Sequence, residues 1–197
     1  MKSSVVKSAV ISLGVLLTGC AGTNFVRMAD DAMILGQTTS EQIAARLGAP
    51  YREGVVTKNN QQIKTSSYAY ASTGGEAAAA GVTAARSQGF YFFSNKLVGY
   101  EFTSSWKEDS TNFDGGKVPQ IKKGESTRSD VVRLLGNPGG RYIYPVIPNN
   151  DEEAMNYMYN QTSGSAFNLK FYQKQLVVTF NRQGIVTNVE FAESGQK

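Results

Sequence analysis

The sequence predicts an α+β fold built from two tandem units, each with short helices packed on a three-stranded antiparallel sheet. The main observation is an internal repeat, in which Gly36–Pro50 aligns without a gap with Gly124–Pro138 at an offset of 88 residues. Two further matches occur at an offset of 89: Tyr68–Tyr70 with Tyr157–Tyr159, and Tyr100–Phe102 with Val189–Phe191. Three matches in the same order at nearly one offset indicate two units of roughly 75 to 80 residues.

Each repeat carries start and stop signals for a helix of two to three turns. The expected N-caps are Thr39 and Thr127, and the glycines that end the helices are Gly48 and Gly136. Gln42 completes a capping box, whereas Asp130 only approximates one. Helices this short are not stable alone, so we expect them to pack on a sheet. Phe25–Leu35 could form an additional helix before the first repeat.

Alternating apolar residues indicate the strands of that sheet. In the second unit Leu176, Val178 and Phe180 share one face, 181–184 is a turn, and a second strand returns. The residues expected to alternate toward the core on that return are Ile185, Thr187, Val189 and Phe191. The segments 90–93 and 97–102 of the first unit repeat this pattern around a turn at 94–96.

These patterns divide the chain into five parts. The predicted boundaries are a signal peptide at 1–19, a tether at 20–31, a first unit at 32–108, a linker at 109–119 and a second unit at 120–197. The first unit includes an alanine- and glycine-rich insertion at 72–89. For this insertion we expect a mobile hairpin; a helix over 76–86, induced by a partner, is the alternative.

The N-terminus has the anatomy of a secretory signal. Lys2 and Lys7 precede an apolar stretch over 9–17, which is too short to span a bilayer. Leu17-Thr18-Gly19-Cys20 follows and resembles the lipobox of bacterial lipoproteins, which implies lipid attachment at Cys20. Cys20 is the only cysteine, so neither an intramolecular disulfide nor a thiolate metal cluster can form. The alternative is an ordinary signal peptide with an incidental cysteine. Ala21, by resemblance to the sorting rule of enteric lipoproteins, favours the outer membrane over the inner membrane.

The order of helix, Leu-Gly-x-Pro, aromatic strand and hairpin resembles the SmpA/OmlA (BamE-like) lipoprotein family. The second unit matches better, over Lys123–Thr127, Val131–Pro138, Tyr157–Tyr159 and Val177–Phe191. The resemblance implies helices against a three-stranded sheet, like half of the β-lactamase inhibitory protein, and a role beside the outer-membrane barrel assembly machinery. The chain departs from the family by being a tandem, and no partner-binding or lipid-binding residue of the family can be placed on it.

The composition argues against several function classes. The chain has no histidine, which excludes histidine-based catalytic triads and histidine metal sites, and we expect no metal and no cofactor. The carboxylates at 30–31, 108–109 and 151–153 are typical of solvated surfaces. A Ser/Lys dyad stays open, without a flanking pattern to support it. The net charge of +4, or +2 without Lys2 and Lys7, is too balanced to indicate nucleic acid.

The sequence therefore predicts a non-enzymatic protein-binding module, held at the periplasmic side of the outer membrane and acting in outer-membrane assembly or envelope integrity. Arg141, Tyr142 and Tyr144 lie between helix and strand and form the predicted partner surface, with simple packing as the alternative. An inhibitor of a periplasmic or secreted enzyme is the second hypothesis, and a hydrolase with an unrecognised site is the third.

Overall fold

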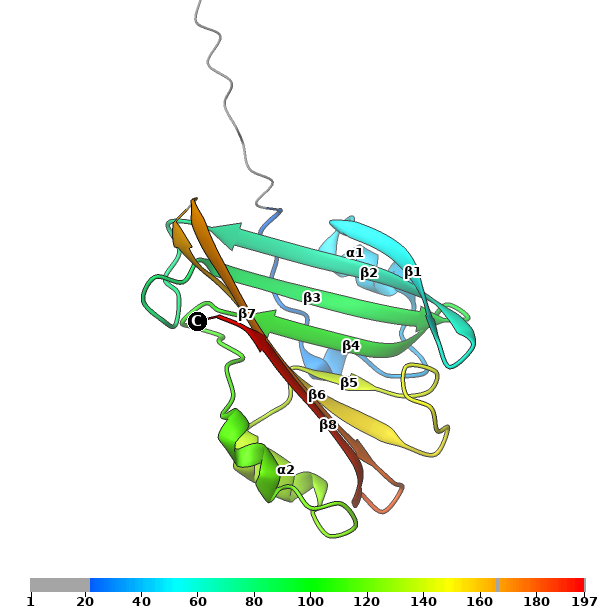
Figure 1. Cartoon of the computed structure of the whole chain (residues 1–197). Helices are drawn as coiled ribbons and strands as arrows, with labels where there is room; N and C mark the ends of the chain where they lie inside the picture. The colour runs from blue at the N-terminus through cyan, green and yellow to red at the C-terminus, as the bar shows by residue number, and fades with distance from the viewer. Residues whose placement is uncertain (1–21, 166, 197) are drawn as a thin grey trace, which may run out of the picture.

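A computed structural model of the chain describes residues 22–165 and 167–196, in which eight antiparallel strands form one curled sheet in chain order (Figure 1). The strands are β1 (Arg52–Lys58), β2 (Gln61–Ser72), β3 (Ala84–Phe93), β4 (Lys96–Ser104), β5 (Gly140–Tyr142), β6 (Glu153–Ser165), β7 (Asn168–Phe180) and β8 (Val186–Gly195). The helices are α1 (Ser40–Leu47) and α2 (Arg128–Leu135), with 3₁₀ turns η1 (Asp30–Ala32) and η2 (Gly115–Gln120). Among the described residues, no helix has the length and apolar character needed to cross a bilayer. The predicted signal peptide and Cys20 lie outside this range.

The mostly antiparallel α+β class is confirmed, but two separate three-stranded sheets are not what the chain forms. The short strand β5 joins the halves, because Gly99 pairs with Tyr142 and Tyr100 with Arg141, while Gly140 pairs with Asn156 of β6. The first half also has a fourth strand, β1, at the sheet edge. Its side chains are nearly all exposed, so it lacks the apolar alternation by which the other strands were predicted.

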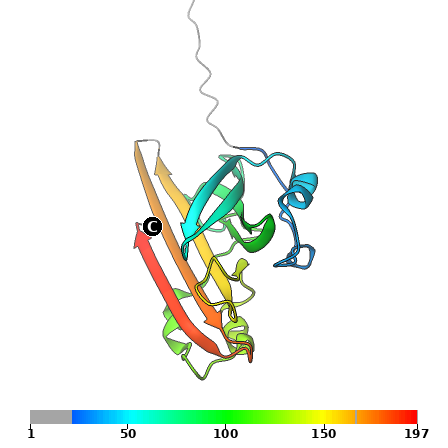
Figure 2. The same ribbon diagram turned by 90° about the vertical axis from the view of Figure 1, so that its right-hand side faces the viewer.

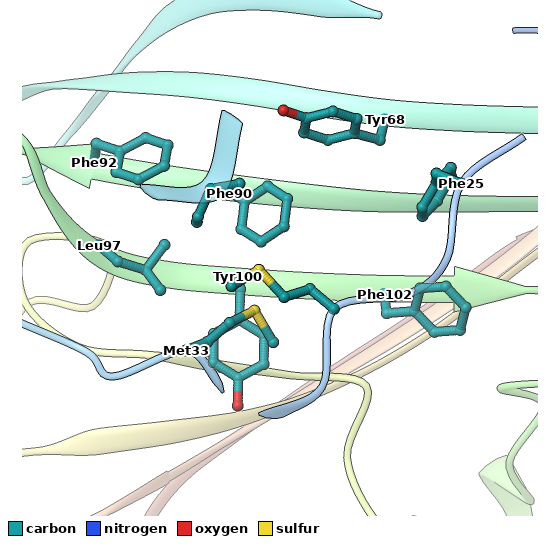
Figure 3. Packing of buried hydrophobic residues seen from close by; sticks show 10 residues of the cluster. Phe25, Met33, Tyr68, Phe90, Phe92, Leu97, Tyr100 and Phe102 are labelled. Carbon is teal, nitrogen blue, oxygen red and sulfur yellow. The ribbon is translucent and has the colours of Figure 1, made fainter. Parts of the chain in front are cut away.

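Both helices cover the same face of the sheet. Residues paired directly across neighbouring strands share a face, and the register runs from Phe90 through Tyr100 and Arg141 to Met155 and Val178. Two apolar clusters lie on this face, one under each helix. The first contains Ile43 of α1 with Phe25, Met28, Met33, Tyr68, Phe90, Phe92, Leu97, Tyr100 and Phe102 (Figure 3). The second contains Val131 of α2 with Phe113, Val118, Ile121, Met155, Tyr157, Leu176, Val178, Phe180 and Val186.

The predicted caps are present in both helices, and both capping boxes are complete. Asp130, expected only to approximate the motif, accepts a hydrogen bond from the Thr127 backbone N–H at 2.9 Å. The backbone and side chain of Thr127 lower the pKa of Asp130 to about 2. At the other end, the Tyr68 hydroxyl donates to the Gly48 carbonyl and the Tyr157 hydroxyl to the Gly136 carbonyl, each at 2.9 Å.

A β-bulge interrupts the closing hairpin of each half, which is β3–β4 in the first half and β7–β8 in the second. The register shifts so that Phe92 pairs with Leu97 and Phe180 with Val186, which leaves one extra residue in β4 and one in β8. The alternation predicted for β8 is therefore correct for Val189 and Phe191 and wrong for the two residues before the shift. Val186, fully buried, takes the inward position that was expected for Ile185 and Thr187.

The predicted tether (20–31) and linker (109–119) are packed parts of the fold where the structure describes them. Phe25 and Met28 are buried in the first cluster, and Phe113 and Val118 are buried in the second. The helix considered for Phe25–Leu35 is wrong, because only the single turn η1 forms there. The sequence signal missed these segments because isolated apolar residues in an extended chain have no period.

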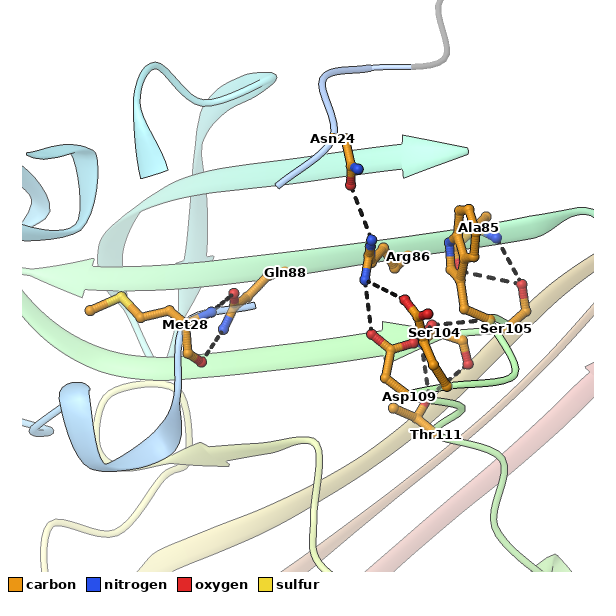
Figure 4. Close-up of polar contacts among 11 residues, drawn as sticks. Asn24, Met28, Ala85, Arg86, Gln88, Ser104, Ser105, Asp109 and Thr111 are labelled. Atoms are coloured by element: carbon orange, nitrogen blue, oxygen red, sulfur yellow. Dashed lines mark hydrogen bonds and ion pairs between the residues drawn. The ribbon is translucent and has the colours of Figure 1, made fainter. Parts of the chain in front are cut away.

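The N-terminal segment is tied to the sheet by polar contacts as well (Figure 4). Gln88 of β3 is fully buried, and its amide accepts from Met28 N at 2.9 Å and donates to Met28 O at 3.1 Å. Four residues earlier, Asn24 Oδ1 accepts from Arg86 Nη2 at 3.0 Å. Gly22 forms an isolated bridge with Tyr70 of β2. The chain is therefore fixed against the sheet from Gly22 onward.

The insertion predicted at 72–89 is shorter than expected, since β3 begins at Ala84. The remaining loop, 73–83, contains no helix over 76–83 and makes isolated bridges from Ala77 to Trp106 and from Val82 to Ser163. Small residues at the start of β3 fit a close approach of neighbouring groups rather than a loop. In the middle of β3, a Cβ on Gly89 would lie 3.3 Å from the Glu101 side chain.

Candidate functional site: a polar hollow on the open face of the sheet

The sheet face opposite the helices contains a hollow of about 690 Å³, called here the open-face hollow. It spans both halves of the chain, since the register places Tyr91, Gly99, Tyr142 and Thr179 on this face. Its floor is formed by Tyr91, Glu101, Tyr142, Met158, Gln175, Val177 and Thr179, and its rim by Lys58, Lys123, Val146–Asn149, Glu152, Thr187, Asn188 and Glu190.

A carboxylate and two tyrosines form the centre of the floor. The Tyr142 hydroxyl donates a hydrogen bond to Glu101 Oε2, and the rings of Tyr91 and Tyr142 meet edge to face with centroids 5.8 Å apart. Burial and the adjacent Glu101 carboxylate raise the pKa of Tyr142 and of Tyr91 well above the ordinary value of tyrosine. Both phenols are therefore neutral hydrogen-bonding groups at neutral pH and cannot act as bases there.

Gly99 of β4 allows the Tyr142 ring to come close to the backbone of that strand. A Cβ on Gly99 would lie 2.7 Å from the Tyr142 ring, so the ring can pack against β4 here only because Gly99 has no side chain. Asn59, in the β1–β2 turn, donates from Nδ2 to the Pro145 carbonyl at 2.9 Å. This bond joins the edge hairpin of the first half to the loop after β5, and it closes one side of the rim.

Two amides and a hydroxyl add hydrogen-bonding capacity beneath and beside the floor. Gln175 Nε2 donates to Asn156 Oδ1 at 2.9 Å. Asn156 is fully buried, and neither its Nδ2 nor the buried Oγ1 of Thr187 has a hydrogen-bond partner among the described residues. A buried polar atom normally has a partner, so these two atoms are places where the fold retains unused hydrogen-bonding capacity.

The predicted partner surface does not form one patch. Arg141 is exposed on the helix-covered face, between the two apolar clusters, whereas Tyr142 is 5% exposed and belongs to the floor of the open-face hollow. Tyr144 is half-buried and lies with Arg128 and Arg182 beside another depression. Arg141 and Tyr142 point to opposite faces because consecutive strand residues alternate, a consequence of the strand β5 that the sequence did not reveal.

The floor residues Glu101 and Gln175, and Asn156 beneath them, were not predicted as site residues. Each reads in the sequence as an ordinary polar position of a strand, and only the pairing of β4 through β7 brings them together. The sequence carries one signal for this site, the polar residues that alternate along the strands on the face of Tyr142. That signal becomes visible only once β5 is known to pair with β4 and β6.

The chemistry of the hollow fits recognition of polar and cationic groups. Glu101 and Glu190 can pair with lysine or arginine, and the half-buried Tyr91 ring can contact a guanidinium or another ring. Among residues 22–165 and 167–196, no group of three or more acidic, histidine or cysteine side chains is placed to hold a metal ion.

The second half of the chain is similar to a known domain family. Residues 113–190 match the family model described as the outer membrane protein assembly factor BamE domain. The match begins at Phe113, the first residue of the second apolar cluster, and includes α2, β5, β6, β7 and the bulge of β8.

A solved structure from Streptococcus mutans, described as a "putative beta-lactamase inhibitor protein", is 16% identical and superposes with a TM-score of 0.40, covering 80% of this chain and 83% of that one. No curated protein matches the chain.

Proposed function

We propose that this chain is a lipid-anchored envelope protein that binds a partner protein through the open-face hollow and acts in outer-membrane assembly or envelope integrity. The observation that carries the proposal is the match of residues 113–190 to the BamE domain, whose description is an outer-membrane assembly factor. Its proposed location is the outer membrane, facing the periplasm, with lipid on Cys20 and without enzymatic activity.

We also propose that the chain contains two copies of one unit, starting at Phe25 and Phe113. Several pairs of contacts at offsets of 88 and 89 support this. Gly36 N donates to Leu97 O and Gly124 N to Val186 O, each at 2.8 Å. Phe25 packs on Tyr68 with ring centroids 6.1 Å apart, and Phe113 packs on Tyr157 at 5.8 Å. The two tyrosine bonds to helix ends and the two bulges correspond in the same way.

Polar character supports the hollow as the contact surface. Non-obligate protein interfaces are about as polar as the rest of the surface and are energetically dominated by a few tyrosines, tryptophans and arginines. The hollow presents the half-buried Tyr91, whose ring packs edge to face on the buried Tyr142, so ordering Tyr91 costs little entropy on binding. Its rim carries both signs of charge, Lys58 and Lys123 against Glu152 and Glu190.

The test is co-purification of the tagged full chain from membranes. The Glu190→Lys substitution reverses a charge at the rim, while Glu125→Lys makes the same change at an exposed loop position before α2. We expect outer-membrane assembly proteins to be recovered with wild type and Glu125→Lys, and at least several-fold less with Glu190→Lys. Equal recovery with all three contradicts the hollow as the binding surface. Recovery of one soluble hydrolase instead would favour the inhibitor hypothesis.

A further inference from the structure

The end of the β6–β7 hairpin exposes an unusual set of apolar side chains. Phe167 is 101% exposed, Phe171 63% and Leu169 51%. They lie at the far end of the hairpin, where Ser165 pairs with Asn168 and Thr162 with Phe171. Soluble proteins seldom expose neighbouring large apolar residues of this kind without a binding function.

This hairpin tip lies at the end of the molecule where the described chain begins. Val82, in the loop between β2 and β3, bridges to Ser163, and Thr83 N donates to Thr162 O at 2.8 Å, so the loop contacts the base of the tip. Gly22 bridges to Tyr70, two residues before β2 ends at Ser72 and enters the same loop. Figures 1 and 2 both show the tip of the hairpin and the start of the described chain at the top of the molecule.

Gly22 follows Cys20 by only two residues, so a lipid on Cys20 would lie close to this end of the sheet. Two residues of fully extended chain span at most about 7 Å. The contacts of Gln88 with Met28 and of Arg86 with Asn24 hold the following segment against the sheet. A lipid on Cys20 would therefore keep this end of the sheet at the membrane surface, with no long tether to let the fold turn away.

We propose that the tip formed by Phe167, Leu169 and Phe171 inserts into the interfacial region of the lipid bilayer as a second membrane contact. The inference rests on the proposed lipid attachment at Cys20. The tip suits this environment, because Lys170 is the single charged residue from Gln161 to Phe171 and aromatic side chains are favoured at the interface between headgroups and hydrocarbon, where a lysine can also reach the headgroups. The second contact sets the orientation of the sheet and points the open-face hollow sideways along the membrane rather than toward it.

The test uses the lipid-carrying full-length protein, purified in detergent and reconstituted into vesicles of phosphatidylethanolamine with a minority of phosphatidylglycerol. Phe167→Trp places an indole at the tip. Ile34→Trp is the matched control, because Ile34 is also exposed, at 52%, but lies far from the tip. Its segment contacts Leu97 at the start of β4, the end of the sheet away from the hairpin tip. The wild-type chain, with its single Trp106, supplies the background. Lipids brominated on the acyl chains quench indoles that enter the bilayer.

We expect the indole of Phe167→Trp to be quenched at least several-fold more than that of Ile34→Trp, with emission shifted to shorter wavelength. Equal and weak quenching in a protein whose fatty acids are verified by mass spectrometry overturns the inference and leaves the anchor intact. A protein without fatty acids overturns both proposals. Shielding of the tip only when envelope proteins are added also overturns the inference, because the tip would then be a protein contact.

Discussion

The seam between the halves depends on a glycine that tolerates no side chain. A Cβ on Gly140 of β5 would lie 2.2 Å from the carbonyl oxygen of Tyr100 and 2.8 Å from Cα of Glu101, both backbone atoms of β4. Neither can rotate away, so Gly140→Ala must push β5 from β4, and only two residue pairs join these strands. Overpacking of this kind costs about 1–3 kcal/mol. For a domain of this size that lowers the melting temperature by roughly 2–12 °C.

Thermal unfolding followed by circular dichroism measures this effect, with Gly74→Ala as the control. Gly74 has no atom within 4 Å of its ideal Cβ position, so its substitution should change stability by less than about 0.5 kcal/mol. A melting temperature of Gly140→Ala equal to that of Gly74→Ala would refute the close β4–β5 seam, and with it the single sheet that carries the hollow.

Other substitutions probe the caps, the equivalent tyrosines and the N-terminal segment. Tyr68→Phe and Tyr157→Phe each remove one hydrogen bond to a helix end, so urea unfolding should show similar losses of about 0.5–1.5 kcal/mol; a loss confined to one variant would contradict equivalent roles. The pKa of Asp130 is lowered to about 2 in the folded protein, so its carboxylate favours folding above about pH 4 and that contribution disappears as the pH falls toward 2. Asp130→Asn should therefore lose less stability than wild type between about pH 5 and pH 3, and parallel losses would show that the cap does not titrate as described. Gln88→Leu leaves the buried N–H and C=O of Met28 unpaired, costing about 1–3 kcal/mol per group, and limited proteolysis should cut the N-terminal segment faster; unchanged cleavage would mean that the segment is held by its apolar contacts alone.

Local signals in the sequence were sufficient for the helices and their caps. Thr39, Thr127, Gly48 and Gly136 act through contacts within a few residues, and such contacts repeat whenever the residues do. The closing hairpins were also predictable from alternation up to the bulge. At the bulge the inward-facing positions shift by one residue, and nothing about Thr187 itself indicates that it is the extra residue.

The hollow could not be predicted, because it depends on pairing across the two halves. Strand β5 is three residues long, too short for a recognisable alternation, yet it decides that Tyr142 faces the hollow and Arg141 the other side. Tyr142 can be buried because Gly99, which lies 43 positions earlier in the chain, has no side chain. The packed segments at Phe25 and Phe113 escaped notice for a related reason, since their partners are distant strands.

The central claim, that the open-face hollow binds an envelope partner, is most directly tested by site-specific photocrosslinking in intact cells. A photoreactive amino acid at Asn188, exposed on the rim, should form a crosslinked product with an outer-membrane assembly protein. The same amino acid at Arg46, exposed on α1 on the opposite face of the sheet, should not. A product from Arg46 and none from Asn188 would contradict the account and assign binding to the helix-covered face.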